Sequence, residues 1–158
     1  MFKKILVPLD GSEHSSRALE TAAQVAKKFH AQLTLLHVYS FVAPVMVAES
    51  FTQATSGLPV IRSSLTPADL AEMEKEARQV GERILFEAKE KLASEGIIVD
   101  SSLTEGNPVQ EITRIAKEGS FDLIVMGIRG IGKLKELLVG SVSDGVIKQS
   151  SCPVLIVK

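Results

Sequence analysis

Short apolar runs alternate along this chain with longer segments of helical periodicity. The runs are Lys3–Pro8, Gln32–Tyr39, Ile97–Thr104, Phe121–Met126 and Pro153–Val157. Most of them are apolar throughout, as expected of strands that are covered on both faces. Strands that alternate with helices favour a parallel sheet with right-handed crossovers and helices on both faces. The sequence therefore predicts a three-layer α/β/α fold, in which helices cover both faces of a five-stranded parallel sheet.

Capping residues predict where the helices between these strands begin. Thr66 with Asp69, and Ser141 with Asp144, have the spacing of a capping box. Proline follows two of the caps at the first helical position, which its fixed φ suits. The predicted caps are Ser12, Thr66, Asn107 and Ser141, for helices that end near residues 30, 94, 118 and 149, with Gly119 closing the third.

The helix after Thr66 carries an apolar stripe that is expected to face the core. The stripe consists of Leu70, Met73, Ala77, Val80, Ile84, Ala88 and Leu92. The strand that follows, Ile97–Thr104, is less apolar than the others, so we expect it at an edge of the sheet.

A segment at about 40–65 interrupts the alternation. It is long for a connection within a compact domain and is rich in apolar residues, with Glu49 and Arg62 as its only charges. Two interpretations stay open: an insertion that packs on its own domain, and a cover or interface over a binding site. Otherwise the 158 residues are expected to form one domain over 1–158.

Composition excludes several classes of function. The net charge of −1 and the absence of tryptophan argue against a nucleic-acid partner. No apolar run approaches the roughly 18 residues of a membrane-spanning helix, and the apolar N-terminus is too short for a signal peptide. With Cys152 as the only cysteine, we expect a cytoplasmic protein without disulfides or a cysteine-based zinc site.

The segment from Gly127 to Ser143 has the character of a phosphate-binding loop. Gly127, Gly130, Gly132 and Gly140 permit positive φ and let backbone N–H groups turn towards one anion. A helix start at Ser141 adds unpaired N–H groups and a partial positive charge. Arg129, Lys133 and Lys135 supply cations nearby.

Two familiar phosphate motifs do not fit this loop. Gly127, Gly132 and Lys133 match most of a Walker A motif, but Leu134 stands where its serine or threonine would hold magnesium. The dinucleotide pattern of three glycines fails because Lys135 takes the place of the third.

A longer spacing does fit a known family. Gly127, Gly130 and Gly140-Ser141, with Val-Pro-Leu-Asp10 after the first strand and Pro-Val-Leu-Ile-Val at the C-terminus, resemble the ATP-binding branch of the universal stress protein family. The resemblance covers essentially the whole chain. It implies a Rossmann-like fold of the adenine nucleotide alpha hydrolase-like type.

The resemblance also implies an adenine nucleotide across the ends of the first and fourth strands, which would be ATP, or ADP or AMP. Mg or Mn would be carried by its phosphates, and Asp10 would reach the metal only through water. The adenine and ribose would contact Pro8, Leu9, Asp10, Val38, Met126 and Gly127. The phosphates would contact Arg129, Gly130, Gly140, Ser141, Val142 and Ser143.

Several of these residues have an alternative structural role. Ser141 and Asp144 can act as helix caps alone, Asp10 is a common turn residue before glycine, and Arg129 can be a solvated cation. The three histidines show no spacing for a metal site.

The function that the resemblance implies is a nucleotide-dependent switch or stress-response module with an unknown protein partner. No general base is evident beside the γ-phosphate, so we expect slow hydrolysis or none, and no catalytic residue. Two alternatives are an ATPase of the adenine nucleotide hydrolase superfamily and a dimeric scaffold that binds no nucleotide. For the ATPase, the Ser-Gly-Gly-x-Asp-Ser loop of the related pyrophosphatases is missing after the first strand. The family also implies a homodimer through the strand 153–157.

Overall fold

The computed structural model of the chain describes residues 2–40, 66–131 and 139–158. Its strands are β1 (Lys4–Pro8), β2 (Gln32–Tyr39), β3 (Asp100–Glu105), β4 (Leu123–Gly127) and β5 (Val154–Val157). Its helices are α1 (Glu13–Phe29), α3 (Pro67–Ser94), α4 (Pro108–Glu118) and α5 (Ser141–Gln149). In these parts of the chain, no helix is both long and apolar enough to cross a membrane.

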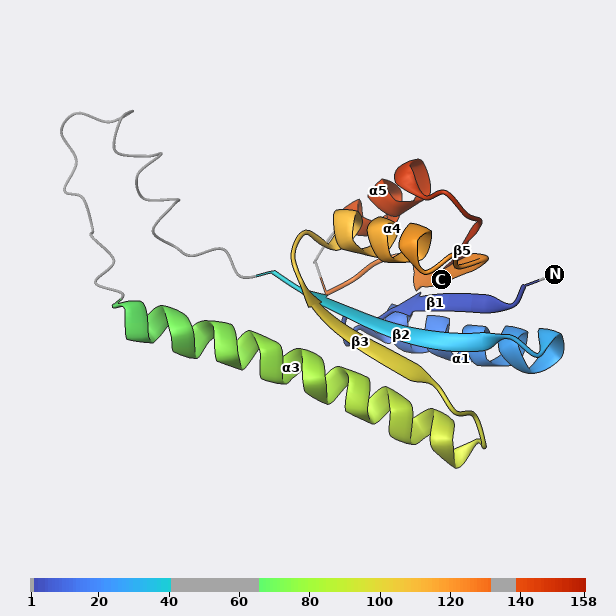
Figure 1. Ribbon diagram of the computed structural model, residues 1–158, viewed down its shortest axis with the longest axis horizontal. Coiled ribbons are helices and arrows are strands. Elements are labelled where there is room, and N and C mark those ends of the chain that lie inside the picture. The colour runs from blue at the N-terminus through green and yellow to red at the C-terminus, as the bar shows by residue number, and fades with distance from the viewer. Residues whose placement is uncertain (1, 41–65, 132–138) are drawn as a thin grey trace.

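The strands form one parallel sheet in the order β3-β2-β1-β4-β5 (Figure 1). This confirms the predicted five-stranded α/β fold and the edge position of β3. The predicted start of β3 was wrong: the strand begins at Asp100, because Ile97 and Ile98 belong to the turn after α3, where Ile98 is 97% exposed. The strand order reverses between β1 and β4, since the chain passes from β1 to β2 on one side and from β4 to β5 on the other.

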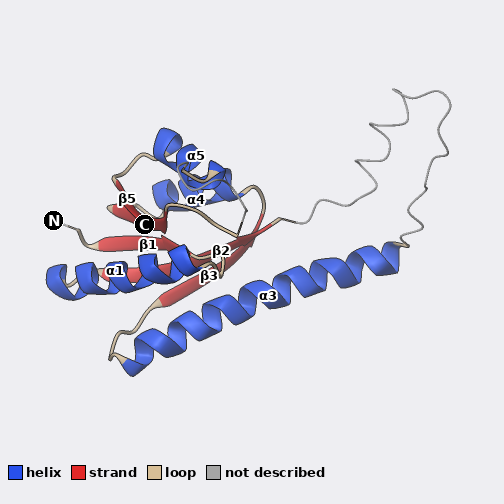
Figure 2. Cartoon of the chain, turned by 180° about the vertical axis from the view of Figure 1, so that it is seen from behind, coloured by secondary structure: helices blue, strands red, loops and turns tan. Residues whose placement is uncertain are grey.

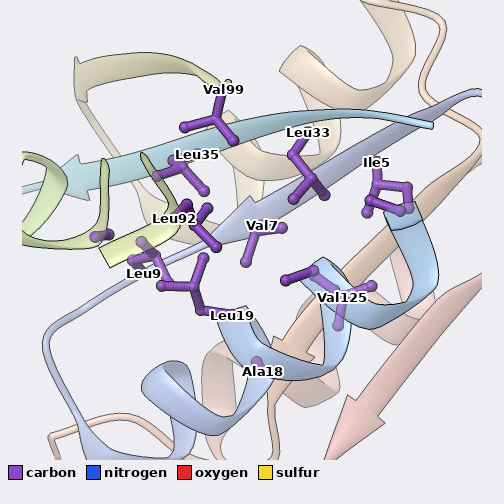
Figure 3. Close-up of a cluster of buried hydrophobic side chains, with 14 of the residues drawn as sticks. Ile5, Val7, Leu9, Ala18, Leu19, Leu33, Leu35, Leu92, Val99 and Val125 are labelled. Carbon is purple, nitrogen blue, oxygen red and sulfur yellow. The ribbon is translucent and has the colours of Figure 1, made fainter. Parts of the chain in front are cut away.

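Helices cover both faces of the sheet, α1 and α3 on one and α4 and α5 on the other (Figure 2). Side chains alternate between these faces along each strand. In β1, Ile5 and Val7 pack in the cluster under α1 and α3, whereas Leu6 packs with Ile112 of α4. Figure 3 shows the first cluster, which joins Leu92 of α3 to side chains of α1, β1, β2 and β4.

Three of the four predicted helix caps are present. Ser12 Oγ accepts a hydrogen bond from Ser15 N–H, and the Asn107 side chain accepts one from Gln110 N–H. The capping box of Thr66 and Asp69 is formed in both directions. These bonds pair N–H groups that a helix start otherwise leaves without partners.

The apolar stripe of α3 is only partly buried, which corrects the prediction. Ala88 and Leu92 are buried, together with Leu85, but Met73 is 41% and Val80 50% exposed among the described residues. The reason is the position of the helix: its first half reaches beyond the sheet at the carboxyl end of β2 (Figure 1). The segment 41–65, for which two roles were open, lies outside the described residues.

One carboxylate joins the starts of β1 and β4, which are neighbours in the sheet. Asp122 Oδ2 accepts hydrogen bonds from the backbone N–H groups of Lys3, at 2.7 Å, and Lys4, at 2.9 Å. Asp122 N–H donates in turn to Lys4 O at 2.9 Å. The bonds from Lys3 and Lys4 hold the pKa of the Asp122 carboxyl below its ordinary value of 3.8.

We expect Asp122→Asn to lower the free energy of unfolding at neutral pH by an amount that disappears in acid. A lowered pKa in the folded state contributes stability above the unfolded pKa, and this contribution is lost as the pH falls through the folded pKa. Asparagine keeps an acceptor oxygen, so the variant isolates the charge. Urea unfolding at pH 7, 5 and 3 measures the difference. A difference between the two proteins that stays constant over this range would contradict the role of the carboxylate.

Candidate functional site

A cavity of about 280 Å³ opens at the carboxyl ends of β1 and β4, where the strand order reverses. Ligands bind in this place in open α/β sheets. All of the residues that the resemblance assigned to a nucleotide line it: Pro8, Leu9, Asp10, Val38, Met126, Gly127, Arg129, Gly130, Gly140, Ser141, Val142 and Ser143. The structure thus brings together residues from four separate segments of the chain.

Further lining residues were missed by the sequence reasoning. They are Ser15, Leu36, Pro108, Ile112 and Ile131. Leu36 precedes Val38 by two positions and so shares its strand face, a periodicity that was available in the sequence. Pro108 and Ile112 are four residues apart on α4, but only the crossover from β3 brings that helix over the cavity.

One part of the cavity is apolar. Leu36, Ile112 and Met126 line it, belong to the cluster under α4 and α5, and are each at most 5% exposed. No charged side chain stands among these three residues. This part of the cavity is suited to a flat, weakly polar group such as an aromatic ring.

Val38 adds a hydrogen-bonding edge beside this apolar part. In a parallel strand, the N–H and C=O groups of successive residues point to opposite neighbours. Leu36 O accepts from Leu9 N–H, on the β1 side, and Tyr39 O accepts from Gly106 N–H, on the β3 side. The backbone groups of Val38 therefore point to the β1 side, beyond the last paired residue of β1, Pro8. They offer one donor and one acceptor to a ligand.

Asp10 links the loops after β1 and β4. Its Oδ1 accepts from Ser12 N–H at 3.0 Å, and its Oδ2 accepts from Ile131 N–H at 3.1 Å. The first bond is the turn role that was one of its two interpretations. A carboxylate accepts more hydrogen bonds than these two, so the turn role does not prevent contact with a ligand hydroxyl.

The glycines of the loop serve close approach, not the positive φ that the sequence analysis expected. Among the described glycines, only Gly11, Gly96 and Gly106 have positive φ. A Cβ atom at Gly130 would lie 2.2 Å from Asp10 Oδ2, and one at Gly127 would lie 2.7 Å from the His14 backbone. Gly127 thus lets α1 pack closely on the end of β4, and Gly130 leaves room for the Asp10 carboxylate between the loops after β1 and β4. Gly132, Lys133 and Lys135 lie outside the described residues.

The start of α5 corrects another prediction. Gly140, and not Ser141, is the N-cap, and no side chain caps the helix. Gly140 N–H donates to Ile128 O at 2.8 Å, and a Cβ there would meet Arg129 Cα at 3.2 Å. This contact holds Gly140 in extended conformation and makes Ser141 the first helical residue.

The uncapped helix start leaves hydrogen-bond donors at the cavity wall. Asp144 N–H bonds to Gly140 O, whereas the N–H groups of Ser141, Val142 and Ser143 have no partner among the described residues. Ser143 is buried, and its hydroxyl donates to Gly127 O at 2.9 Å, which ties α5 to the end of β4. Three free N–H groups at the positive end of a helix form a site for an anion.

Charged side chains are few around the cavity. Among the described lining residues, Asp10 and Arg129 are the only titratable ones. In the same part of the chain, no three His, Cys, Asp or Glu side chains come close enough to hold a metal ion. The donors for an anion are thus mainly backbone groups, and a cation would find Asp10 as its one carboxylate.

Comparisons with known proteins agree with this geometry. The model of the universal stress protein family matches residues 1–158. The universal stress protein YxiE of Bacillus subtilis is 39% identical over 158 residues, covering all of both chains. A solved protein of Methanocaldococcus jannaschii has a TM-score of 0.76 at 30% identity, over 100% of this chain and 96% of that one. A universal stress protein solved in complex with cAMP has a TM-score of 0.66 at 26% identity, over 99% and 97%.

These matches extend over the short apolar runs, the capped helices and both loops of the cavity. They confirm the family, though not its ATP-binding branch, that was inferred from the spacing of Gly127, Gly130 and Gly140. The chain belongs to the universal stress protein family.

Proposed function

We propose that the cavity binds ATP and that the protein works as a nucleotide-dependent stress-response module. The observation that carries this proposal is the uncapped start of α5, which presents the N–H groups of Ser141, Val142 and Ser143 to one side of the cavity. On the proposed binding mode, the phosphates accept from these groups. The solved relative in complex with cAMP supports an adenine nucleotide as ligand.

The adenine ring occupies the apolar part of the cavity in this proposal. Its edge, with a donor and an acceptor side by side, pairs with the backbone of Val38. Met126 and Gly127 lie under the ribose, and Asp10 accepts from a ribose hydroxyl. Arg129, Gly130 and Gly140 line the path of the phosphates, and Mg or Mn is held by the phosphates and water.

Hydrolysis is slow or absent on this account. A general base needs a titratable group within hydrogen-bond reach of the attacking water. Asp10 is the one carboxylate of the described cavity lining, and on the proposed binding mode it faces the ribose and not the γ-phosphate. A phosphate-release assay that gave turnover in the range of ~1 to 100 s⁻¹, as for kinases, would contradict this account and favour an ATPase.

Gly130→Ala is expected to abolish measurable ATP binding. The new Cβ would lie 2.2 Å from Asp10 Oδ2, so either the Asp10 carboxylate gives up its bond to Ile131 N–H and leaves its place at the cavity, or the loops after β1 and β4 separate. Isothermal titration calorimetry with ATP measures the effect. Gly96→Asn is a matched control, because a Cβ at Gly96 meets nothing within 4 Å and asparagine tolerates its positive φ. Wild-type affinity in Gly130→Ala would contradict the proposed site.

Ser141→Pro is expected to weaken ATP binding by about ten-fold relative to Ser141→Ala, as for one lost bond to a charged group. Proline removes the Ser141 N–H but is tolerated at the first helical position, and the extended Gly140 before it suits a following proline. Alanine removes only the hydroxyl. The affinity for adenosine should be equal in the two variants. Equal ATP affinities would show that this N–H does not bind phosphate.

We also propose a homodimer that forms through β5. This strand is at the edge of the sheet, and Leu155 is 37% exposed. Pro153 O and Val157 O accept from β4, so the backbone groups of Val154 and Ile156 point to the open edge by alternation. An apolar edge strand of this kind favours pairing with its own copy.

Ile156→Pro is expected to convert the dimer to a monomer. The substitution removes an N–H that points away from β4, so the bonds within the sheet remain. Light scattering at micromolar concentration measures the mass, with Ile156→Val as control. A monomeric wild-type protein, or a dimeric proline variant, would refute pairing through β5.

A further inference from the structure

His37 is a buried polar residue for which the nucleotide site has no assigned use. It lies on β2, is 8% exposed, and its Nδ1 is 2.7 Å from Leu9 O. A carbonyl oxygen only accepts hydrogen bonds, so Nδ1 carries the proton and donates it. The contact joins residues that are 28 positions apart in the chain.

The hydrogen bond from His37 holds the chain at the point where it leaves β1. Leu9 N–H donates to Leu36 O at 2.8 Å, and Leu9 O accepts from His37. Two successive residues of β2 therefore bind the backbone N–H and C=O groups of Leu9. Asp10 follows at once and accepts from Ser12 and Ile131. The orientation of the Asp10 carboxylate thus depends on how firmly Leu9 is held.

The helix α3 confines the imidazole ring from the other side. A Cβ at Gly81 would lie 2.5 Å from His37 Cδ2 and 2.6 Å from Leu103 Cδ1. The helix therefore approaches β2 and β3 as closely as a glycine allows. The ring has little freedom to turn away from Leu9 O.

We propose that His37 is a positioning residue that orients the turn after β1, and with it Asp10, for the ligand. It acts through the Leu9 carbonyl and does not line the cavity. The consequence for ATP affinity rests on the proposed function, but the order of the turn is a property of the ligand-free protein. The two are measured separately.

The test compares His37→Leu with His37→Asn. Leucine fills the space without a donor, and the loss of a bond to a buried carbonyl is expected to raise the exchange rates of the Ser12 and Ile131 amides by about ten-fold. The side-chain amide nitrogen of asparagine lies three bonds from Cα, as Nδ1 of histidine does, and it can donate to Leu9 O. His37→Asn is therefore expected to have exchange rates within about two-fold of wild type. Exchange is measured by NMR on the ligand-free full chain.

Leu35→Val is the control for a general loss of packing. Leu35 is fully buried on the same face of β2 but makes no bond to the turn. Leu35→Val is expected to raise the exchange rates of amides in the strands. It is not expected to raise the rates of the Ser12 and Ile131 amides more than those. Rates in His37→Leu that match wild type, or rates that asparagine fails to restore, would overturn the proposal.

ATP affinity is the second readout. We expect His37→Leu to bind ATP at least about five-fold more weakly than wild type, and His37→Asn to bind within about two-fold. Equal ATP affinities of wild type and His37→Leu would overturn the claim that the order of the turn after β1 affects ligand binding. Failure of the wild-type protein to bind ATP would instead refute the proposed function, and the amide exchange rates would still decide the role of His37.

Discussion

The reversal of strand order between β1 and β4 is the constraint on which the candidate site depends. Right-handed crossovers that lead in opposite directions place α1 and α5 on opposite faces of the sheet. The segments that follow β1 and β4 therefore diverge as they leave the sheet, and the cavity lies at the carboxyl ends of these two strands. Asp10 joins the loops on its two sides, and the glycine at Gly130 gives the carboxylate the space to reach Ile131 N–H.

The site gathers its donors from the backbone, which explains how a chain of net charge −1 can offer a place for a phosphate. The helix start at Ser141 lacks a cap, and the N–H groups of its first turn remain available on the described wall of the cavity. The other helices of the described chain have side-chain caps on their first turns. The proposed phosphate site requires this difference, because a side-chain cap on α5 would occupy the N–H groups that the phosphates are proposed to contact.

Much of the fold was predictable because the signals are local. Apolar runs, the Thr66 capping box and Asn107-Pro108 act within a few residues, and they gave the helices and most strand bounds. The exposure of Met73 and Val80 was not predictable, because it depends on where α3 extends past the sheet. The residues of the candidate site were grouped by resemblance, and Pro108 and Ile112 were missed because only tertiary structure brings α4 to the cavity.

Two errors about the loop share one physical cause. The glycines were expected to supply positive φ, and Ser141 was expected to cap α5, as local rules suggest. In the structure, space is the determining factor at Gly130, and the contact of Gly140 with Ile128 and Arg129 moves the helix start by one residue. Contacts between distant segments replaced the local preference in both cases.

The most direct test of the central claim is an NMR titration of the backbone amides with ATP and, separately, with adenosine. Our account predicts that ATP shifts the amides of Val38 and of Ser141, Val142 and Ser143, whereas adenosine shifts Val38 and leaves the three amides of α5 unshifted. ATP-induced shifts confined to other parts of the chain, or no shift at millimolar ATP, would contradict the account.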